Sequence, residues 1–143
     1  MNQLCLSASL RRTERLVTRH YDEWLAPAGV TAVQLPILAM IAAEEEPSLR
    51  QLSEQLDLDR STLSRNLGYL RERGWVKLGP SSGPKPGLIS LTAKGRDTLA
   101  RAHQLWRTAH RELESTLSET TMGESLALLK RVRRKTREAR VTR

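Results

Sequence analysis

The sequence predicts a mainly α-helical fold with one small β-hairpin, and three observations lead to this expectation. Between residues 48 and 74, leucines recur in two short stripes at helical spacing, with a tight turn between them. Residues 75–92 read as two short apolar strands around a loop rich in Gly and Pro. Amphipathic stretches stand on both sides of this region, and a composition without Phe favours an aliphatic, helical core.

Two helices are expected before the leucine stripes. The first should cover residues 3–26 and end at residues 27–29, because Pro interrupts a helix and Gly suits a left-handed cap. Thr31 is a suitable N-cap for the second, and Pro36 stands in its opening turns, where a missing N–H costs least. The glutamates at 44–46 have no His or Asp nearby, so we expect a solvated helix end and not a metal site.

The leucine stripes predict two short helices joined by a tight turn. The leucines fall at positions 49, 52 and 56 and at positions 63, 67 and 70. Asp59 stands at the N-cap of the second helix, where its carboxylate can accept from free N–H groups of the next turn. With the leucines turned inward, the opposite face carries hydroxyls and an arginine, which suits a helix in a DNA groove. This is the pattern of a helix-turn-helix with Arg60–Glu72 as the recognition helix.

A short hairpin is expected after the recognition helix. Gly74 is suited to end that helix, and residues 75–78 and 88–92 have the composition and alternation of strands. The loop between them, residues 79–87, carries one positive charge, Lys85, and no acid. A hairpin in this place forms the wing of a winged helix-turn-helix.

Two further helices are expected towards the C-terminus. One should run from Thr92 to about Ser118, and the next should open at Thr121, where Glu124 completes the spacing of a capping box. Beyond Val132 the chain is polar and basic, and we expect this tail to be frayed. The first helix and these last two have apolar faces that a winged-helix core cannot fully cover, so a symmetric homodimer is expected.

These elements predict three parts that form one intertwined unit. Residues 1–30 are expected to be an N-terminal dimerisation helix, and residues 31–92 a winged helix-turn-helix DNA-binding domain. Residues 93–143 are expected to hold the C-terminal dimerisation helices and the basic tail.

The net charge of +8 is concentrated in two regions. Residues 47–96, with the helix-turn-helix and the wing, carry nine basic and four acidic side chains, and residues 130–143 carry eight and one. A basic patch on a helix-turn-helix is the electrostatic footprint of a DNA-binding protein. A single Cys, no long apolar run and no signal-peptide pattern predict a cytoplasmic protein without an internal disulfide or a membrane span.

The order of the elements resembles that of the MarR family of winged-helix regulators. The segments that carry the resemblance are TRHYDEWLAPAGVTAVQ (18–34), LRQLSEQLDLDRSTLSRNLGYLRERGWV (49–76) and LISLTAKGRDTL (88–99). The resemblance implies a homodimer that binds a palindromic operator. It also implies, for many members, a sensor for a small molecule or an oxidant near the junction of the dimer and the DNA-binding domain.

Three positions depart from the family pattern. Family wings hold an Asp-x-Arg element whose Arg enters the minor groove, and here Lys85 is the only candidate substitute. Ser53 stands where a small apolar Ala is usual, and Asp57 stands where Gly is usual. Because Asp tolerates a left-handed backbone better than most residues, the turn can still form.

Six residues are candidates for contacts with DNA. Arg can bond a guanine edge through two parallel hydrogen bonds, and Ser and Thr can bond bases or phosphates. The candidates are Arg60, Ser61, Thr62, Ser64, Arg65 and Lys85. Exposed apolar residues on the same helix face would instead indicate the alternative function, a winged-helix module for protein contacts whose basic tail binds nucleic acid non-specifically.

Two kinds of sensor site are candidates. Cys5 resembles, in its place near the start of the first helix, the reactive cysteine of family members that sense peroxide; the alternative is a small buried or interface residue. A small aromatic or carboxylate effector could bind near Arg15, His20, Trp24, Met40 and Trp106, although core packing would explain both Trp residues equally well. His103 and His110 are seven residues apart on one face, but no Cys or acid cluster accompanies them, so no metal is expected.

The sequence therefore predicts a dimeric, sequence-specific DNA-binding transcriptional regulator. We expect a repressor of a palindromic operator that a small molecule or an oxidant releases. The expected partners are double-stranded DNA with an inverted repeat and a second copy of the chain, and no cofactor or membrane is expected. No nucleophile elbow, zinc-protease motif or dinucleotide fingerprint is present, so an enzyme is not expected.

Overall fold

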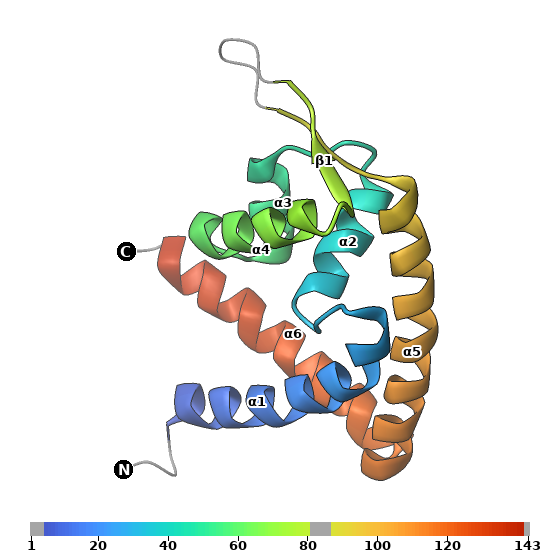
Figure 1. Cartoon of the computed structure of the whole chain (residues 1–143). Coiled ribbons are helices and arrows are strands. Elements are labelled where there is room, and N and C mark those ends of the chain that lie inside the picture. The colour runs from blue at the N-terminus through green and yellow to red at the C-terminus, as the bar shows by residue number, and fades with distance from the viewer. Residues whose placement is uncertain (1–4, 81–86, 142–143) are drawn as a thin grey trace. The chain divides into compact units, whose positions relative to one another are not determined.

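The computed structural model describes residues 5–80 and 87–141 (Figure 1). These residues form α-helices, one short 3-10 helix and one two-stranded hairpin, which confirms the mainly α-helical fold with a small β-hairpin. In chain order the elements are α1 (Leu6–Leu25), η1 (Ala26–Ala28), α2 (Gln34–Ala43), α3 (Leu49–Leu56), α4 (Arg60–Glu72), β1 (Val76–Leu78), β2 (Ile89–Leu91), α5 (Ala93–Leu117) and α6 (Glu119–Val141).

The chain forms two compact units, Met1–Trp106 and Arg107–Arg143. The first contains α1 to α4, the hairpin and the first half of α5, and the second contains the rest of α5 with α6. The boundary falls inside α5. The division expected from the sequence, into residues 1–30 and 93–143 for dimerisation and residues 31–92 for DNA binding, describes roles in a dimer. It therefore stays a prediction. Within residues 5–80 and 87–141, none of the helices has the length and apolarity that crossing a bilayer requires.

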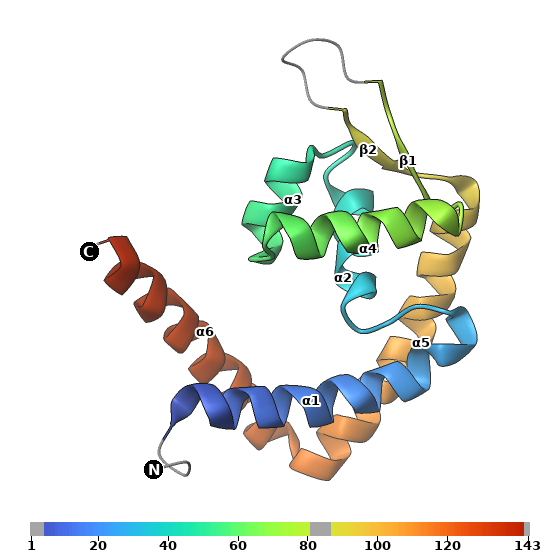
Figure 2. The same cartoon turned by 60° about the vertical axis from the view of Figure 1, so that its left-hand side comes forward.

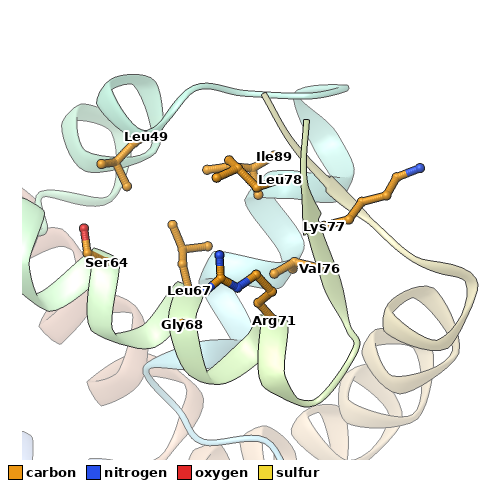
Figure 3. A pocket seen from close by; sticks show the side chains of 9 residues that line it. All are labelled: Leu49, Ser64, Leu67, Gly68, Arg71, Val76, Lys77, Leu78 and Ile89. Atoms are coloured by element: carbon orange, nitrogen blue, oxygen red, sulfur yellow. The ribbon is translucent and has the colours of Figure 1, made fainter. Parts of the chain in front are cut away.

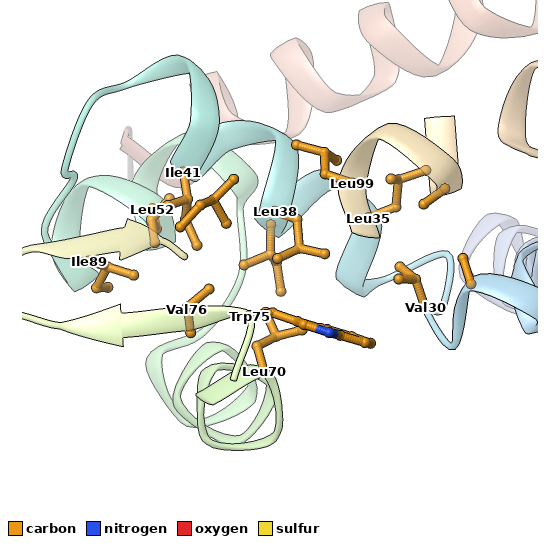
Figure 4. Packing of buried hydrophobic residues seen from close by; sticks show 14 of the residues in the cluster. Val30, Leu35, Leu38, Ile41, Leu52, Leu70, Trp75, Val76, Ile89 and Leu99 are labelled. Carbon is orange, nitrogen blue, oxygen red and sulfur yellow. The ribbon is translucent and has the colours of Figure 1, made fainter. Parts of the chain in front are cut away.

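The core of the first unit is aliphatic and is centred on α2. Ile37, Leu38 and Ile41 expose at most 2% of their surface, because α3 and β2 both contact this helix. Figure 4 shows Leu38 and Ile41 together with other members of the same core cluster: Leu52, Leu70, Trp75, Val76, Ile89 and Leu99. Burying a Leu or Ile side chain contributes about 1.5–3 kcal/mol relative to leaving it exposed. The leucine stripe of α4 therefore anchors the recognition helix to this core.

The connection from α1 to α2 forms where the sequence predicts it, with a small shift. Gly29 adopts φ of 70° and ends η1, the short 3-10 helix that continues from α1. The Thr31 hydroxyl oxygen accepts from the Gln34 amide at 3.2 Å, and the Gln34 side chain accepts from the Thr31 amide at 3.1 Å. Thr31 therefore caps the start of α2, although regular helical structure begins only at Gln34.

Side-chain hydrogen bonds fix both ends of α3. Ser48 and Gln51 form a reciprocal capping box at its start. At its end Asp57 adopts the left-handed conformation, with φ of 53°. The Ser53 hydroxyl donates a hydrogen bond to the carbonyl oxygen of Leu58 at 2.7 Å and closes the turn. The two departures that lie in the helix-turn-helix thus act together, since Asp57 provides the bend and Ser53 ties across it.

The hairpin and the start of α5 are packed closely together. β1 and β2 pair in antiparallel order, with Val76 opposite Leu91. Trp75, which the sequence predicts in the first strand, precedes β1 and is buried in the core. Thr92 caps α5 by accepting from the Gly95 amide at 2.9 Å. A Cβ atom added to Gly95 would stand 2.0 Å from the carbonyl oxygen of Trp75, so only glycine fits this contact.

The hairpin is also joined to the segment that leads into α3. Ser48 and Leu88 form an isolated antiparallel bridge, and the Ile89 amide donates to the carbonyl oxygen of Pro47 at 2.9 Å. Ser48 is at the same time the N-cap of α3. The wing and the helix-turn-helix therefore share a hydrogen-bonded seam.

The last helix differs from the sequence prediction at both ends. It begins at Glu119, two residues before Thr121, because Ser118 adopts φ of 71° and its hydroxyl oxygen accepts from the Thr121 amide at 3.3 Å. The helix then continues past Val132 to Val141, so the tail that was expected to be frayed is helical. Arg, Lys, Glu and Ala are good helix formers, and this propensity outweighs the repulsion between the basic side chains.

Candidate nucleic-acid interface

α4 presents one exposed polar face while its opposite face lies in the core. Leu63 and Leu70 are fully buried on the inner side. The bounds of the helix, Arg60–Glu72, and its N-cap, Asp59, agree with the sequence prediction. Figure 2 shows α4 along its length, with α3 beside its N-terminal half and the hairpin rising beside its C-terminal half. This arrangement leaves the N-terminal half of α4 accessible to a partner.

Five of the six predicted DNA-contacting residues lie in the first two turns of α4. Arg60, Ser61, Ser64 and Arg65 are exposed, and Thr62 is half-buried. Two guanidinium groups and three hydroxyls thus gather at the end of the helix that reads base edges in helix-turn-helix proteins. The sixth, Lys85, lies outside the described residues, so its role as a substitute for the usual wing arginine stays a prediction.

The carboxylate of Asp59 organises the first turn of α4. Its Oδ1 accepts hydrogen bonds from the Ser61 hydroxyl at 2.5 Å and from the Thr62 amide at 2.8 Å, and its Oδ2 accepts from the Thr62 hydroxyl at 2.7 Å. These bonds, the one from the Ser61 hydroxyl foremost, hold the pKa of Asp59 well below its usual range. The sequence predicts the bond to the amide but not the two to the hydroxyls, which the Asp-x-Ser-Thr pattern could have indicated.

Aromatic side chains hold Arg73 at the other end of the recognition helix. Its guanidinium lies 4.9 Å from the centroid of the Tyr69 ring and 5.5 Å from that of Trp75, and it donates to the Tyr69 hydroxyl. The Arg73 carbonyl oxygen accepts from Nζ of Lys94 at 2.9 Å. Each cation–π contact contributes about 0.5–1 kcal/mol at an exposed site. Arg73 therefore stabilises the junction of α4 with the wing.

A largely aliphatic groove lies between α3, α4 and the hairpin (Figure 3). It is lined by Leu49, Ser64, Leu67, Gly68, Arg71, Val76, Lys77, Leu78 and Ile89. The Lys77 side chain extends away from the others in Figure 3. The volume of the groove is about 220 Å³, which is smaller than the roughly 300–1,000 Å³ of pockets for drug-sized ligands. Sequence spacing could not reveal it, because three separate elements form its walls.

The residues predicted to bind an effector lie in two different surroundings. Trp106 stacks on Tyr21, with ring centroids 6.5 Å apart, and His20 approaches Tyr21 edge-on at 5.5 Å. Met40 and Trp106 are half-buried against the core, and Trp24 is half-buried as well. Arg15 instead lines a surface depression with other residues of α1 and with Ala26. Tyr21, which is not among the residues predicted from the sequence, thus contacts both His20 and Trp106.

The remaining candidates concern redox and metal chemistry. Cys5 is exposed, and it is the N-cap residue of α1, where its carbonyl oxygen accepts from the Ser9 amide at 3.0 Å. Oxidation of Cys5 as a signal stays a prediction. In residues 5–80 and 87–141, no group of three or more His, Cys, Asp or Glu side chains is arranged to hold a metal ion.

The sequence has recognisable relatives. Residues 28–85 match the sequence profile described as the MarR family. The multiple antibiotic resistance protein MarR of Escherichia coli (strain K12) is 32% identical over 116 residues, which cover 80% of this chain and 81% of that protein.

Solved structures resemble the chain over most of its length. The M. tuberculosis transcriptional regulator MosR in complex with DNA has a TM-score of 0.79 and 30% identity, covering 93% of this chain and 98% of that chain. The transcriptional repressor CouR bound to p-coumaroyl-CoA has a TM-score of 0.80 and 26% identity, covering 91% and 92%. Together with the capped recognition helix and the wing that follows it, these similarities establish that the chain belongs to the MarR family of winged-helix transcriptional regulators.

Proposed function

We propose that the protein is a homodimeric repressor that binds an inverted-repeat operator in double-stranded DNA. The observation that supports this most directly is the exposed N-terminal end of α4, where Arg60, Ser61 and Arg65 stand on a helix anchored in the core. Residues 47–96 carry nine basic and four acidic side chains. Neutralising phosphates with such side chains releases counterions, which favours binding.

Exposed aliphatic side chains support a dimer. Leu6 and Leu16 of α1 expose 59% and 61% of their surface, and Leu126 and Leu129, which lie three residues apart on one side of α6, expose 56% and 41%. Large apolar side chains that a helix leaves exposed in this number favour an interaction surface on that helix. A two-fold axis would place the two copies of α4 in successive major grooves about 34 Å apart, so the half-sites should lie about 10 bp apart.

The operator is tested with the purified protein and fragmented genomic DNA from its source. Fragments that the protein retains are sequenced and then measured by gel shift at several salt concentrations. We expect an inverted repeat that binds roughly a thousandfold or more tightly than random DNA, with affinity that falls steeply as salt rises. Retention of all fragments with equal affinity would contradict the proposal and indicate a non-specific nucleic-acid binder.

The dimer is tested by sedimentation of the wild type and of two matched variants. Leu126→Glu places a charge on the exposed apolar side of α6, and Leu78→Glu places the same charge on the hairpin, where Leu78 exposes 57% of its surface. We expect a dimer for the wild type and for Leu78→Glu, and weaker association for Leu126→Glu. If the wild type sediments as a monomer at the concentrations at which it binds the operator, the proposal of a dimer is wrong.

Release by a signal completes the proposed function. CouR is a repressor solved with p-coumaroyl-CoA, and the aromatic acyl group of that ligand supports the aromatic member of the predicted aromatic or carboxylate effectors for this chain. In a gel-shift assay, aromatic carboxylates are added to the complex of the protein with its operator. The concentration that removes the shifted band is compared between the wild type and a Trp106→Phe variant. For an oxidant, mild peroxide is added to the wild type and to Cys5→Ser. If mass spectrometry shows that Cys5 is fully oxidised and the operator affinity is unchanged, redox sensing by Cys5 is excluded.

A further inference from the structure

The hydroxyl protons of Ser61 and Thr62 are both directed to one carboxylate. Asp59 accepts from the Ser61 hydroxyl at 2.5 Å and from the Thr62 hydroxyl at 2.7 Å, through different oxygens. An ionised carboxylate has no proton to donate, so each hydroxyl must be the donor in its bond. Each hydroxyl has a single proton, and what remains available to a partner is the lone pairs of its oxygen.

The position of Asp59 makes this arrangement stable. It is the N-cap of α4, with extended backbone angles of −65° and 151°, and its Oδ1 also accepts from the Thr62 amide at 2.8 Å. The free N–H groups and the dipole at the start of a helix favour a negative charge there. Three hydrogen bonds therefore hold the carboxylate between the two hydroxyls.

We propose that Asp59 is a positioning residue that restricts Ser61 and Thr62 to accepting hydrogen bonds, so that the operator bases facing them are adenine or cytosine. This inference rests on the proposed function, in which the N-terminal end of α4 reads DNA. In the major groove, adenine and cytosine present exocyclic amino groups that donate, while guanine O6 and thymine O4 only accept. An unrestrained Ser or Thr hydroxyl can bond either class.

The same restriction directs these hydroxyls away from the DNA backbone. Phosphate oxygens only accept hydrogen bonds, and Ser and Thr reach them by donating their proton. With both protons bound to Asp59 and a negative charge next to them, Ser61 and Thr62 are poor phosphate ligands. Positioning on the backbone then falls to cations such as Arg60, and the hydroxyls are kept for base edges.

The test compares the base preferences of the wild type with those of Asp59→Asn. Asn is as good an N-cap as Asp, and its shape is the same. Its Nδ2 group donates, however, so the hydroxyl next to it becomes the acceptor and regains a free proton. Both proteins select sites from a randomised DNA library at one salt concentration. Ser61→Ala and Thr62→Val, selected in parallel, identify the base positions that depend on each hydroxyl.

We expect those positions to hold adenine or cytosine on one strand in the wild-type selection, about fivefold or more over guanine and thymine. In Asp59→Asn this preference should fall to about twofold or less at one or both positions, because a hydroxyl with a free proton bonds either class. Asp57→Asn is the matched control, since it removes the same charge two residues earlier, at a left-handed position that Asn tolerates. It should change affinity without changing base preference.

A triple variant separates positioning from direct contact. When Ser61→Ala and Thr62→Val are already present, Asp59→Asn should no longer change the preference. If it does, Asp59 itself reads the base and the inference is wrong. The inference also fails if the hydroxyl-dependent positions hold guanine or thymine, if no position depends on the hydroxyls, or if Asp59→Asn selects as the wild type does. A wild type that selects no sequence at all would instead remove the proposed function.

Discussion

The hydroxyl of Ser53 in α3 donates a hydrogen bond of 2.7 Å to the carbonyl oxygen of Leu58, across the turn that leads into α4. A typical hydrogen bond of this kind contributes about 0.5–1.5 kcal/mol. Ser53→Ala should therefore lower the free energy of unfolding by about 1 kcal/mol, despite the better helix propensity of Ala. Urea denaturation measures it, with exposed Gln55→Ala in the same helix as the control. A more stable Ser53→Ala protein would show that the turn does not need this bond.

The contact of Gly95 with Trp75 predicts a large effect of a single methyl group. Gly95→Ala would place its Cβ 2.0 Å from the carbonyl oxygen of Trp75. The Cβ atom is attached to the backbone and the oxygen belongs to it, so neither can move aside by a side-chain rotation. We expect a loss of about 2–3 kcal/mol in the free energy of unfolding. Gly123→Ala in α6 meets nothing within 4 Å and should gain about 1 kcal/mol from helix propensity. Equal stability of the two variants in thermal unfolding would contradict the close contact.

Arg65 on the exposed face of α4 is expected to read a base. If it binds a guanine through two hydrogen bonds, Arg65→Ala should lose about 1–3 kcal/mol, or roughly 5- to 150-fold in operator affinity, and relax the preference at one position. Arg11→Ala on α1 removes the same charge outside the helix-turn-helix. Gel shifts with both variants on the operator and on random DNA check this. Equal weakening on both DNAs would reassign Arg65 to a phosphate contact.

The cap of α4 is expected to be insensitive to pH in the physiological range. Hydrogen bonds from Ser61 and Thr62 lower the pKa of Asp59 from 3.8 in the folded protein. A carboxyl with a lowered pKa contributes stability above its unfolded value and loses it as the pH falls below that value. The stability difference between the wild type and Asp59→Asn should thus be constant from about pH 8 to pH 5 and shrink below about pH 4. Urea unfolding curves at each pH measure it, and a change between pH 8 and 6 would implicate another group.

Local signals explain what the sequence predicts well. The recognition helix has the expected bounds because its N-cap, Asp59, and its leucine spacing are both encoded within a few residues. The exposed face of α4 also agrees with the prediction. All residues of α4 are described, and among them Tyr69 is the one large hydrophobic residue that is exposed. That composition disfavours the alternative function as a protein-docking helix.

Features that depend on side-chain conformation or on distant contacts were not predictable. The Asp59 carboxylate, expected to cap one amide, also binds two hydroxyls, and spacing alone does not determine rotamers. The capping-box spacing of Thr121 and Glu124 predicts a helix start at Thr121, but Ser118, in an uncommon left-handed conformation, caps the helix three residues earlier. The aromatic contact of Trp106 with Tyr21 joins helices far apart in the chain, so no periodicity could indicate it.

The bond from the Ile89 amide to the carbonyl oxygen of Pro47 has a mechanical consequence. β2 cannot tilt away from the helix-turn-helix without first breaking this bond and the adjoining bridge between Ser48 and Leu88. Because Ser48 also caps α3, a force applied to the hairpin reaches that helix directly. A displacement of β2 is therefore coupled mechanically to the start of α3. The covalent chain and these hydrogen bonds connect the two elements, and no flexible linker lies between them.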